Sequence, residues 1–75
     1  MDIEKYESVG KWYEDMRSAG YAIPLAMCHG ITQAMKELKM SFPEAFRLLE
    51  KNKRIILVGK SYIYNLQGHK GFKAE

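Results

Sequence analysis

The chain has 75 residues, of which 47% are hydrophobic and 28% charged, a composition that supports one folded domain and leaves no room for a second core. Its single cysteine, Cys28, excludes an internal disulfide, so packing must supply the stability, and a reducing, cytoplasmic setting is expected. No apolar run has the length of a membrane-spanning helix, and the first residues lack the order of a secretion signal, so we expect neither membrane insertion nor export. We expect one globular domain over residues 1–67 and a flexible basic tail over residues 68–75.

Positive charge is concentrated toward the carboxyl end of the chain. The net charge is +3, but residues 1–50 carry six basic against eight acidic residues, whereas residues 51–75 carry six basic against one acidic residue. A cluster of cations attracts phosphate groups over about one Debye length, roughly 8 to 10 Å in physiological salt. The alternative interpretation is a solubilising rim around an apolar hairpin.

Helical periodicity predicts a first helix from about Asp2 to Arg17, with Gly20 as its C-terminal stop. Trp12 lies about one residue off the main apolar stripe, and we expect it in the core. The stripe itself recurs at three- and four-residue spacing and consists of Ile3, Tyr6, Val9, Tyr13 and Met16.

A second helix is predicted from about Pro24 to Lys39, because proline suits the first turn of a helix. We expect this helix to continue through Gly30. A break there is the alternative, and it would give the segment a partial likeness to a helix-turn-helix. The predicted inward stripe is Leu25, Cys28, Ile31, Met35 and Leu38.

A third, short helix has the clearest local signal in the chain. The Ser41 hydroxyl and the Glu44 carboxylate are spaced to form a capping box, and Asn52 is a suitable terminator. The predicted inward stripe of this helix is Phe42, Ala45, Phe46 and Leu49.

Two strongly β-forming runs, 54–58 and 61–66, flank Gly59-Lys60 and predict a hairpin with a type II′ turn. Pairing Val58 with Ser61 puts Ile56 opposite Ile63 on one face. Leu57 and Ile55 then lie opposite Tyr62 and Tyr64 on the other face. Both faces are apolar, so one must pack on the helices. We expect the tyrosine-bearing face to remain for a partner, a third strand or a homodimer.

No arrangement of residues in the sequence indicates an enzyme. Cys28 and His29 diverge by about 100° on a helix, so they cannot act as a nucleophile and base pair. Together with His69 they lack a recognised zinc spacing. We therefore predict no catalytic residue, no metal and no cofactor.

The order of three helices followed by a hairpin predicts an α+β, winged-helix-like fold. The piece from about Lys36 to Leu66 resembles the small winged-helix excisionases of phages and mobile elements. The resemblance rests on Ser41-x-x-Glu44, the stripe through Leu49, and the hairpin. It implies that the third helix enters a major groove while Lys60 contacts the DNA backbone. Glu44 and Glu50 on that helix, and the long acidic first helix, depart from the family pattern.

The same fragment is also similar to small phage proteins that include the Thoeris anti-defence type. This similarity rests on Phe42-x-Glu44-Ala45-x-x-x-Leu49, followed by the basic pair at 53–54 and a hairpin. It implies capture of a nucleotide signal. The tryptophan that these proteins have after the basic pair is missing here.

Two functions follow from the sequence as hypotheses. The first is a non-enzymatic nucleic-acid-binding accessory protein, encoded by a phage or mobile element, whose clustered cations gain affinity by counterion release. Its contact residues would be Arg47, Lys51, Lys53, Arg54 and Lys60. The second is a phage-encoded inhibitor or adaptor that binds a protein partner through the Tyr62/Tyr64 face or through the strand edge.

Overall fold

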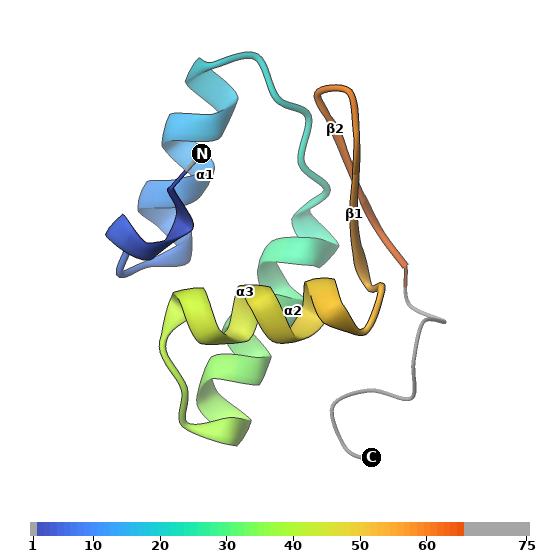
Figure 1. The fold of residues 1–75 in the computed structure, drawn as a ribbon. Helices are drawn as coiled ribbons and strands as arrows, with labels where there is room; N and C mark the ends of the chain where they lie inside the picture. The colour runs from blue at the N-terminus through green and yellow to red at the C-terminus, as the bar shows by residue number, and fades with distance from the viewer. Residues whose placement is uncertain (1, 66–75) are drawn as a thin grey trace.

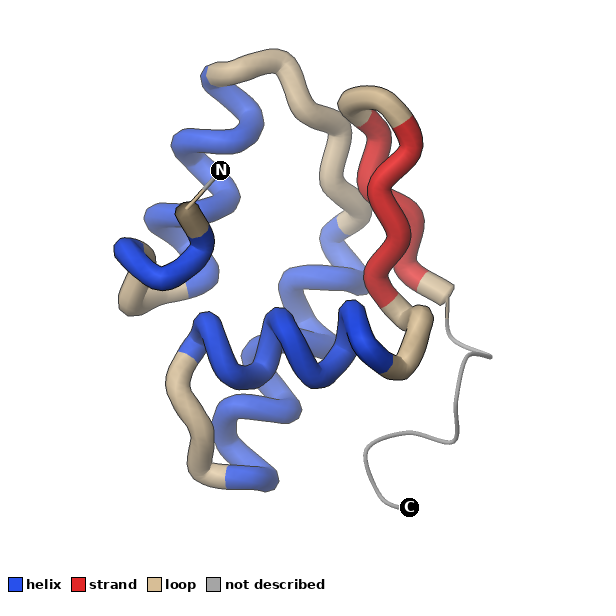
Figure 2. Tube along the Cα trace, in the orientation of Figure 1, coloured by secondary structure: helices blue, strands red, loops and turns tan. Residues whose placement is uncertain are grey.

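The computed structural model describes residues 2–65, and it has an α+β architecture in which three α-helices precede an antiparallel hairpin (Figures 1 and 2). This arrangement confirms the predicted α+β class with three helices followed by a hairpin. The expected tail over residues 68–75 lies outside the described residues. The elements in chain order are the 3₁₀ helix η1 (Ile3–Lys5), α1 (Val9–Ser18), α2 (Leu25–Leu38), α3 (Phe42–Lys51), β1 (Ile55–Val58) and β2 (Ser61–Tyr64).

The amino-terminal segment is divided into two pieces, so the prediction of one helix from Asp2 to Arg17 is wrong. Asp2 caps η1, and the chain is then extended at Tyr6. The Ser8 hydroxyl accepts a hydrogen bond from the N–H of Lys11 and starts α1 anew. The physical reason is that a serine side chain satisfies one of the unpaired N–H groups at a helix start, which favours a boundary at that position.

All three α-helices end in a left-handed residue followed by a backbone bond that reaches five residues back. Gly20, with φ of 94°, serves α1 and confirms the predicted stop. Lys39 and Lys53, with φ of 52° and 62°, take the same role after α2 and α3. The closing bonds are Tyr21 N–H to Met16 C=O at 2.9 Å, Met40 N–H to Met35 C=O at 3.2 Å and Arg54 N–H to Leu49 C=O at 2.9 Å.

Helix α2 is continuous through Gly30, as predicted, but it is rotated from the predicted orientation. Leu25 is 63% exposed and Leu38 is 38% exposed, so the predicted inward stripe is wrong at both ends. The residues of α2 that are buried are Met27, Ile31 and Ala34. The rotation lets the hairpin approach the helix backbone at Gly30, where the Tyr64 ring lies.

The hairpin has the predicted register, from Ile55 opposite Tyr64 to Val58 opposite Ser61. Gly59 has a φ of 65°, as the first central position of a type II′ turn requires. The segment between α1 and α2 pairs with β2 through one isolated parallel bridge: the Ala22 N–H donates to Lys60 C=O at 2.9 Å, and the Tyr62 N–H donates to Ala22 C=O at 2.8 Å. One edge of the hairpin is therefore covered.

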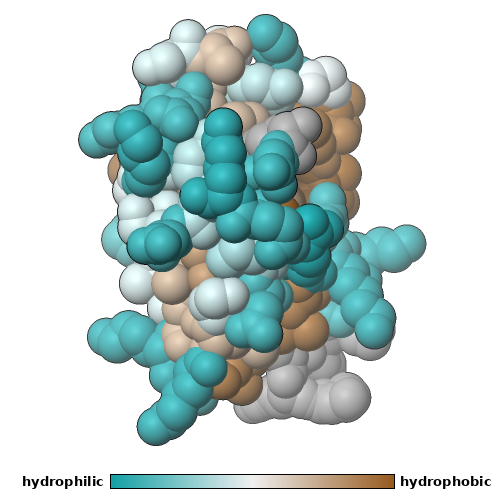
Figure 3. Space-filling model, turned by 60° about the vertical axis from the view of Figure 1, so that its left-hand side comes forward, coloured by the Kyte–Doolittle hydropathy of each residue, from teal (hydrophilic) through white to brown (hydrophobic). Residues whose placement is uncertain are grey.

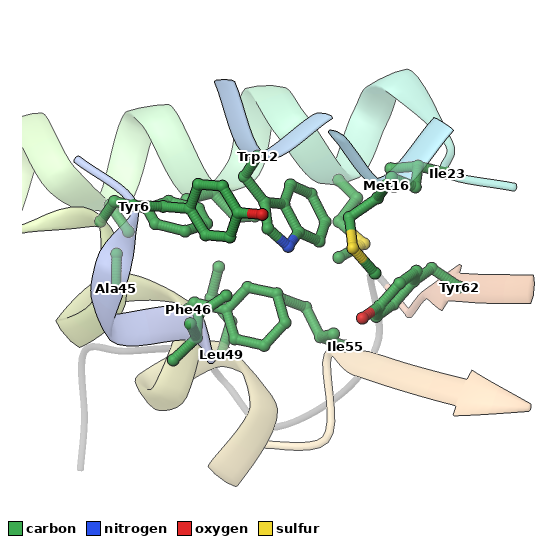
Figure 4. Close-up of a cluster of buried hydrophobic side chains, with 14 residues drawn as sticks. Tyr6, Trp12, Met16, Ile23, Ala45, Phe46, Leu49, Ile55 and Tyr62 are labelled. Atoms are coloured by element: carbon green, nitrogen blue, oxygen red, sulfur yellow. The ribbon is translucent and has the colours of Figure 1, made fainter. Parts of the chain in front are cut away.

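Trp12 is the centre of the core and is fully buried, as predicted (Figure 4). Its ring centroid lies 5.7 Å from that of Phe42, 5.4 Å from that of Phe46 and 5.5 Å from that of Tyr62. These separations are within the range of favourable aromatic pairs. The predicted inward stripe of α3 is confirmed, and so is its capping box between Ser41 and Glu44.

The prediction that the tyrosine-bearing face is open to a partner is wrong. Tyr62 is 6% exposed and Ile55 is 3% exposed, because this face packs on the helices. Tyr64 is half-buried against α2. Both hairpin faces are apolar, so alternation alone could not tell which one turns inward. The face that stays outside carries Ile56, Val58 and Ile63.

Candidate functional site

The five basic residues expected to form a nucleic-acid interface are not gathered on one surface. Arg47 faces the amino-terminal segment, where its Nε donates to the Glu4 carboxylate at 2.9 Å. Both side chains of this pair are exposed, so the attraction is weak in water, but it neutralises the charge of Arg47 locally. Arg47 is therefore a poor contact for phosphate in this arrangement.

Lys60 at the hairpin tip makes intramolecular contacts with the end of α1. Its Nζ donates to the Ala19 C=O at 3.0 Å and lies 5.3 Å from the centroid of the Tyr21 ring. A cation beside the carbonyl end of a helix is favoured by the helix dipole. Lys60 thus fixes the hairpin tip to the body of the protein (Figure 1).

Lys51 is the last residue of α3, and Lys53 and Arg54 lie in the turn that follows, at the opposite end of the hairpin from Lys60. Arg54 and Lys60 lie on either side of β1, whose four residues span roughly 13 Å at 3.3 Å per residue, which exceeds a Debye length. Lys51 and Lys53 are exposed. Arg54 is half-buried, and its Nη1 lies 3.4 Å from the Tyr64 hydroxyl. The structure therefore brings together three of the five predicted residues.

The hairpin also presents large apolar side chains to solvent. We call Ile56, Val58 and Ile63 the outer hairpin surface; they are 38%, 60% and 46% exposed, respectively. Leu57 is 46% exposed but lies on the opposite face, at the edge of the hairpin. On the face drawn in Figure 3, hydrophilic side chains cover most of the area, and hydrophobic surface gathers along the right-hand edge. A contiguous apolar patch rimmed by polar residues is typical of an interaction site.

Strand β1 has an edge with no strand beside it among the described residues. The N–H of Tyr62 donates to Ala22, away from β1, so Leu57 and Tyr62 form a non-hydrogen-bonded pair of the antiparallel ladder. The N–H and C=O of Leu57 must then point away from β2 as well. The edge of β1 therefore offers backbone groups beside the outer hairpin surface.

The described residues include one thiol, Cys28, and no cluster of side chains suited to metal binding. Burial raises the pKa of the Cys28 thiol, which keeps it protonated at neutral pH and makes it a poor nucleophile. Burial and the hydrogen bond donated to Asp15 raise the pKa of Tyr6.

Within residues 2–65, no three His, Cys, Asp or Glu side chains cluster to hold a metal ion. No helix in the same range is long and apolar enough to span a bilayer.

The sequence identified both faces of the hairpin as apolar but missed which one stays exposed. The outer hairpin surface could have been found only from the packing of Trp12, because contact with the Trp12 ring places Tyr62, and with it the opposite face of the hairpin, in the core.

Comparison of the chain with protein-family models, with curated proteins and with solved structures gives no significant match.

Proposed function

We propose that this chain is a non-enzymatic accessory protein that binds a protein partner through the outer hairpin surface and the edge of β1. The observation that carries the proposal is the exposure of Leu57 and Val58, at 46% and 60%, beside an edge whose backbone groups have no neighbouring strand among the described residues. Exposed aliphatic side chains next to unpaired backbone groups favour association with another chain.

The charge distribution supports a protein partner over a nucleic acid. Arg47 pairs with Glu4, Lys60 with a backbone carbonyl and Arg54 with the Tyr64 hydroxyl, so three of the five cations are already engaged within the molecule. Lys51 and Lys53 lie with Arg54 at one end of the apolar surface, a position in which they can provide a polar rim to a protein interface. The context we propose is a phage or mobile element, as the two resemblances imply, and the setting is cytoplasmic, as expected from the single cysteine.

Capture from a bacterial extract by the immobilised full chain, with a matched pair of variants, tests the proposal. We expect the double variant Ile56→Thr/Ile63→Thr to lose the captured protein, because threonine keeps the β-propensity of the cross-strand pair and removes its apolar contact. Leu25→Gln is the control, since Leu25 is 63% exposed on a different element. Equal capture by all three proteins would contradict the proposal.

Nucleic-acid binding through Lys51, Lys53 and Arg54 is the second candidate. It is favoured by the exposure of Lys51 and Lys53, neither of which makes an ion pair with another residue of the described range. Phosphate contacts by the two exposed lysines, Lys51 and Lys53, would give a slope of log K against log salt of about −1.8 on duplex DNA. Titration at two salt concentrations measures this slope.

We expect Lys51→Ala/Lys53→Ala to weaken any such DNA binding and flatten its salt dependence, because both substitutions remove phosphate contacts. The control is Lys36→Ala/Lys39→Ala, which removes the same charge from exposed positions on and just after α2. Absence of binding at low salt, or equal affinity of the two double variants, would eliminate this candidate.

A further inference from the structure

We propose that the partner supplies an extended segment that pairs antiparallel with the edge of β1 and carries acidic residues at its carboxyl-terminal end. This inference rests on the proposed protein-binding function and specifies the chemistry of the partner. It depends on the direction of the backbone groups of Leu57, the charge at each end of β1, and the apolar side chains that flank the edge.

The backbone of β1 is positioned to accept another strand. Because the N–H of Tyr62 bonds to Ala22 and not to β1, Tyr62 and Leu57 form a non-hydrogen-bonded pair, and so do Tyr64 and Ile55 two positions away. The N–H and C=O of both Ile55 and Leu57 therefore point away from β2. Residues on the same edge of a strand repeat every second position, so Ile55 and Leu57 share this edge, but Ile55 is 3% exposed and only Leu57 is open to hydrogen bonds with an incoming strand. Leu57 is 46% exposed, which leaves this part of the edge accessible to solvent.

The charge around β1 selects an acidic segment. From Lys51 to Lys60 the chain has four basic residues and no acidic one. Lys51 and Lys53 are exposed and lie just before the strand, whereas Lys60 is occupied by the Ala19 carbonyl at the other end. In an antiparallel pair, the carboxyl-terminal end of the partner segment lies beside the start of β1. Acidic residues at that end would therefore lie near Lys51 and Lys53.

The same charges disfavour a second copy of this chain as the occupant. Antiparallel pairing of β1 with β1 of another copy would place Lys53 and Arg54 of one molecule near Lys60 of the other. Parallel pairing would place Lys53 beside its own equivalent. Like charges across a strand pair are destabilising in both cases. An acidic partner converts the same positions into favourable ones.

The outer hairpin surface defines the remaining side chains of the partner. Ile56 and Val58 project from β1 to the exposed face, and Ile63 lies beside Ile56 on β2. A segment added to β1 would place every second side chain next to this apolar row. β-Branched residues at those positions would extend it with favourable cross-strand contacts.

Titration of the isotopically labelled protein with a defined peptide tests the inference. The probe is acetyl-Thr-Val-Thr-Val-Thr-Glu-Glu-amide, followed by amide resonances and by hydrogen exchange. We expect saturable binding and at least tenfold slower exchange of the Leu57 N–H, because this donor becomes bonded to the peptide. A peptide methylated at alternate backbone nitrogens should bind at least tenfold more weakly, since it lacks the matching donors.

Two charge controls check the orientation and the acidic preference. A peptide with Lys-Lys in place of Glu-Glu should bind about fivefold more weakly at low salt, as expected for two exposed ion pairs. In Lys51→Glu/Lys53→Glu the preference should reverse, whereas in Lys36→Glu/Lys39→Glu, which has the same net charge, it should persist. Moving the two glutamates to the amino-terminal end of the peptide should also weaken binding.

The outcomes separate this inference from the proposed function. No saturable binding at millimolar peptide, or unchanged exchange at Leu57, overturns the strand-pairing inference even if capture still depends on Ile56 and Ile63. Equal binding of the acidic and basic peptides overturns the acidic preference. A dimer in light scattering that dissociates when the peptide is added would identify a second copy as the occupant and overturn the choice of partner.

Discussion

The backbone of Gly30 and the ring of Tyr64 are in direct contact where α2 meets the hairpin. A methyl group at Gly30 would overlap the Tyr64 hydroxyl and the ring carbon that bears it. The same hydroxyl lies 3.4 Å from Nη1 of Arg54. The glycine is therefore needed for close approach of the two elements, although it weakens the helix locally.

Gly30→Ala should destabilise the protein by up to about 2 kcal/mol. Overpacking costs about 1 to 3 kcal/mol and is offset by a gain of about 1 kcal/mol in helix propensity. Urea unfolding followed by the fluorescence of Trp12, the one tryptophan of the chain, measures the change. In a Tyr64→Ala background the same substitution should be close to neutral or stabilising. Gly10→Ala is the control: apart from the adjacent residues and the backbone of α1 itself, no atom lies within 4 Å of the added methyl group, so a gain of about 0.5 to 1 kcal/mol is expected.

Lys39→Gly should stabilise the protein by about 1 kcal/mol. Lys39 has a φ of 52° after α2, a left-handed conformation that costs a residue with a side chain about 1 to 2 kcal/mol. Glycine removes that strain, but it also raises the conformational entropy of the unfolded chain, which reduces the gain in stability. Thermal and urea unfolding measure the difference. Lys36→Gly, inside the same helix, should instead lose about 1 kcal/mol, and stabilisation by both substitutions would contradict the explanation.

Lys60→Ala should lower the free energy of unfolding by roughly 0.5 to 1.5 kcal/mol, because it removes both the bond to the Ala19 carbonyl and the contact with the Tyr21 ring. The control is Lys11→Ala, whose ion pair with Asp15 is exposed and whose loss should change stability by at most about 0.5 kcal/mol. DNA titration of Lys60→Ala should match the wild type. A loss of DNA affinity without a loss of stability would restore Lys60 as a phosphate contact.

The stability of the protein should fall between pH 10 and pH 12 through Tyr62. Burial, with smaller contributions from the charges of Tyr21 and Glu50, raises the pKa of Tyr62 to about 12 from its ordinary value of 10.0. Below pH 10 the phenol of Tyr62 is neutral in both the folded and the unfolded protein. Above pH 10 this phenol ionises in the unfolded chain before it ionises in the folded protein, which favours unfolding by at most about 1.4 kcal/mol per pH unit. Tyr62→Phe should flatten this part of the curve. Identical slopes for the two proteins in urea unfolding would contradict this assignment.

Short-range signals in the sequence were sufficient for several elements of the fold. Ser41 and Glu44 are three residues apart, and the pairing of Val58 with Ser61 depends on a two-residue turn, so the capping box and the register could be predicted. Ser8 carried an equally local signal that was missed because no glutamate follows it at the third position. These features depend on bonds within a few residues, which a sequence displays directly.

The candidate site depended on contacts between distant segments, and these could not be predicted. Glu4 and Arg47 are 43 residues apart, and Lys60 and Ala19 are 41 apart, so no spacing rule indicates that either cation is engaged. The inward turn of Tyr62 follows from the position of Trp12 across the core. Exposure of the outer hairpin surface is therefore a property of tertiary packing, which one sequence does not reveal when both faces are apolar.

The segment around Ala22 gives the hairpin one closed edge and one open edge. Unlimited stacking of identical sheets requires two open edges per molecule, so that each copy can add to the last. With β2 covered, any strand that joins β1 ends the sheet at that point. Complexes formed through this hairpin should therefore have a fixed one-to-one stoichiometry and should not grow into fibrils.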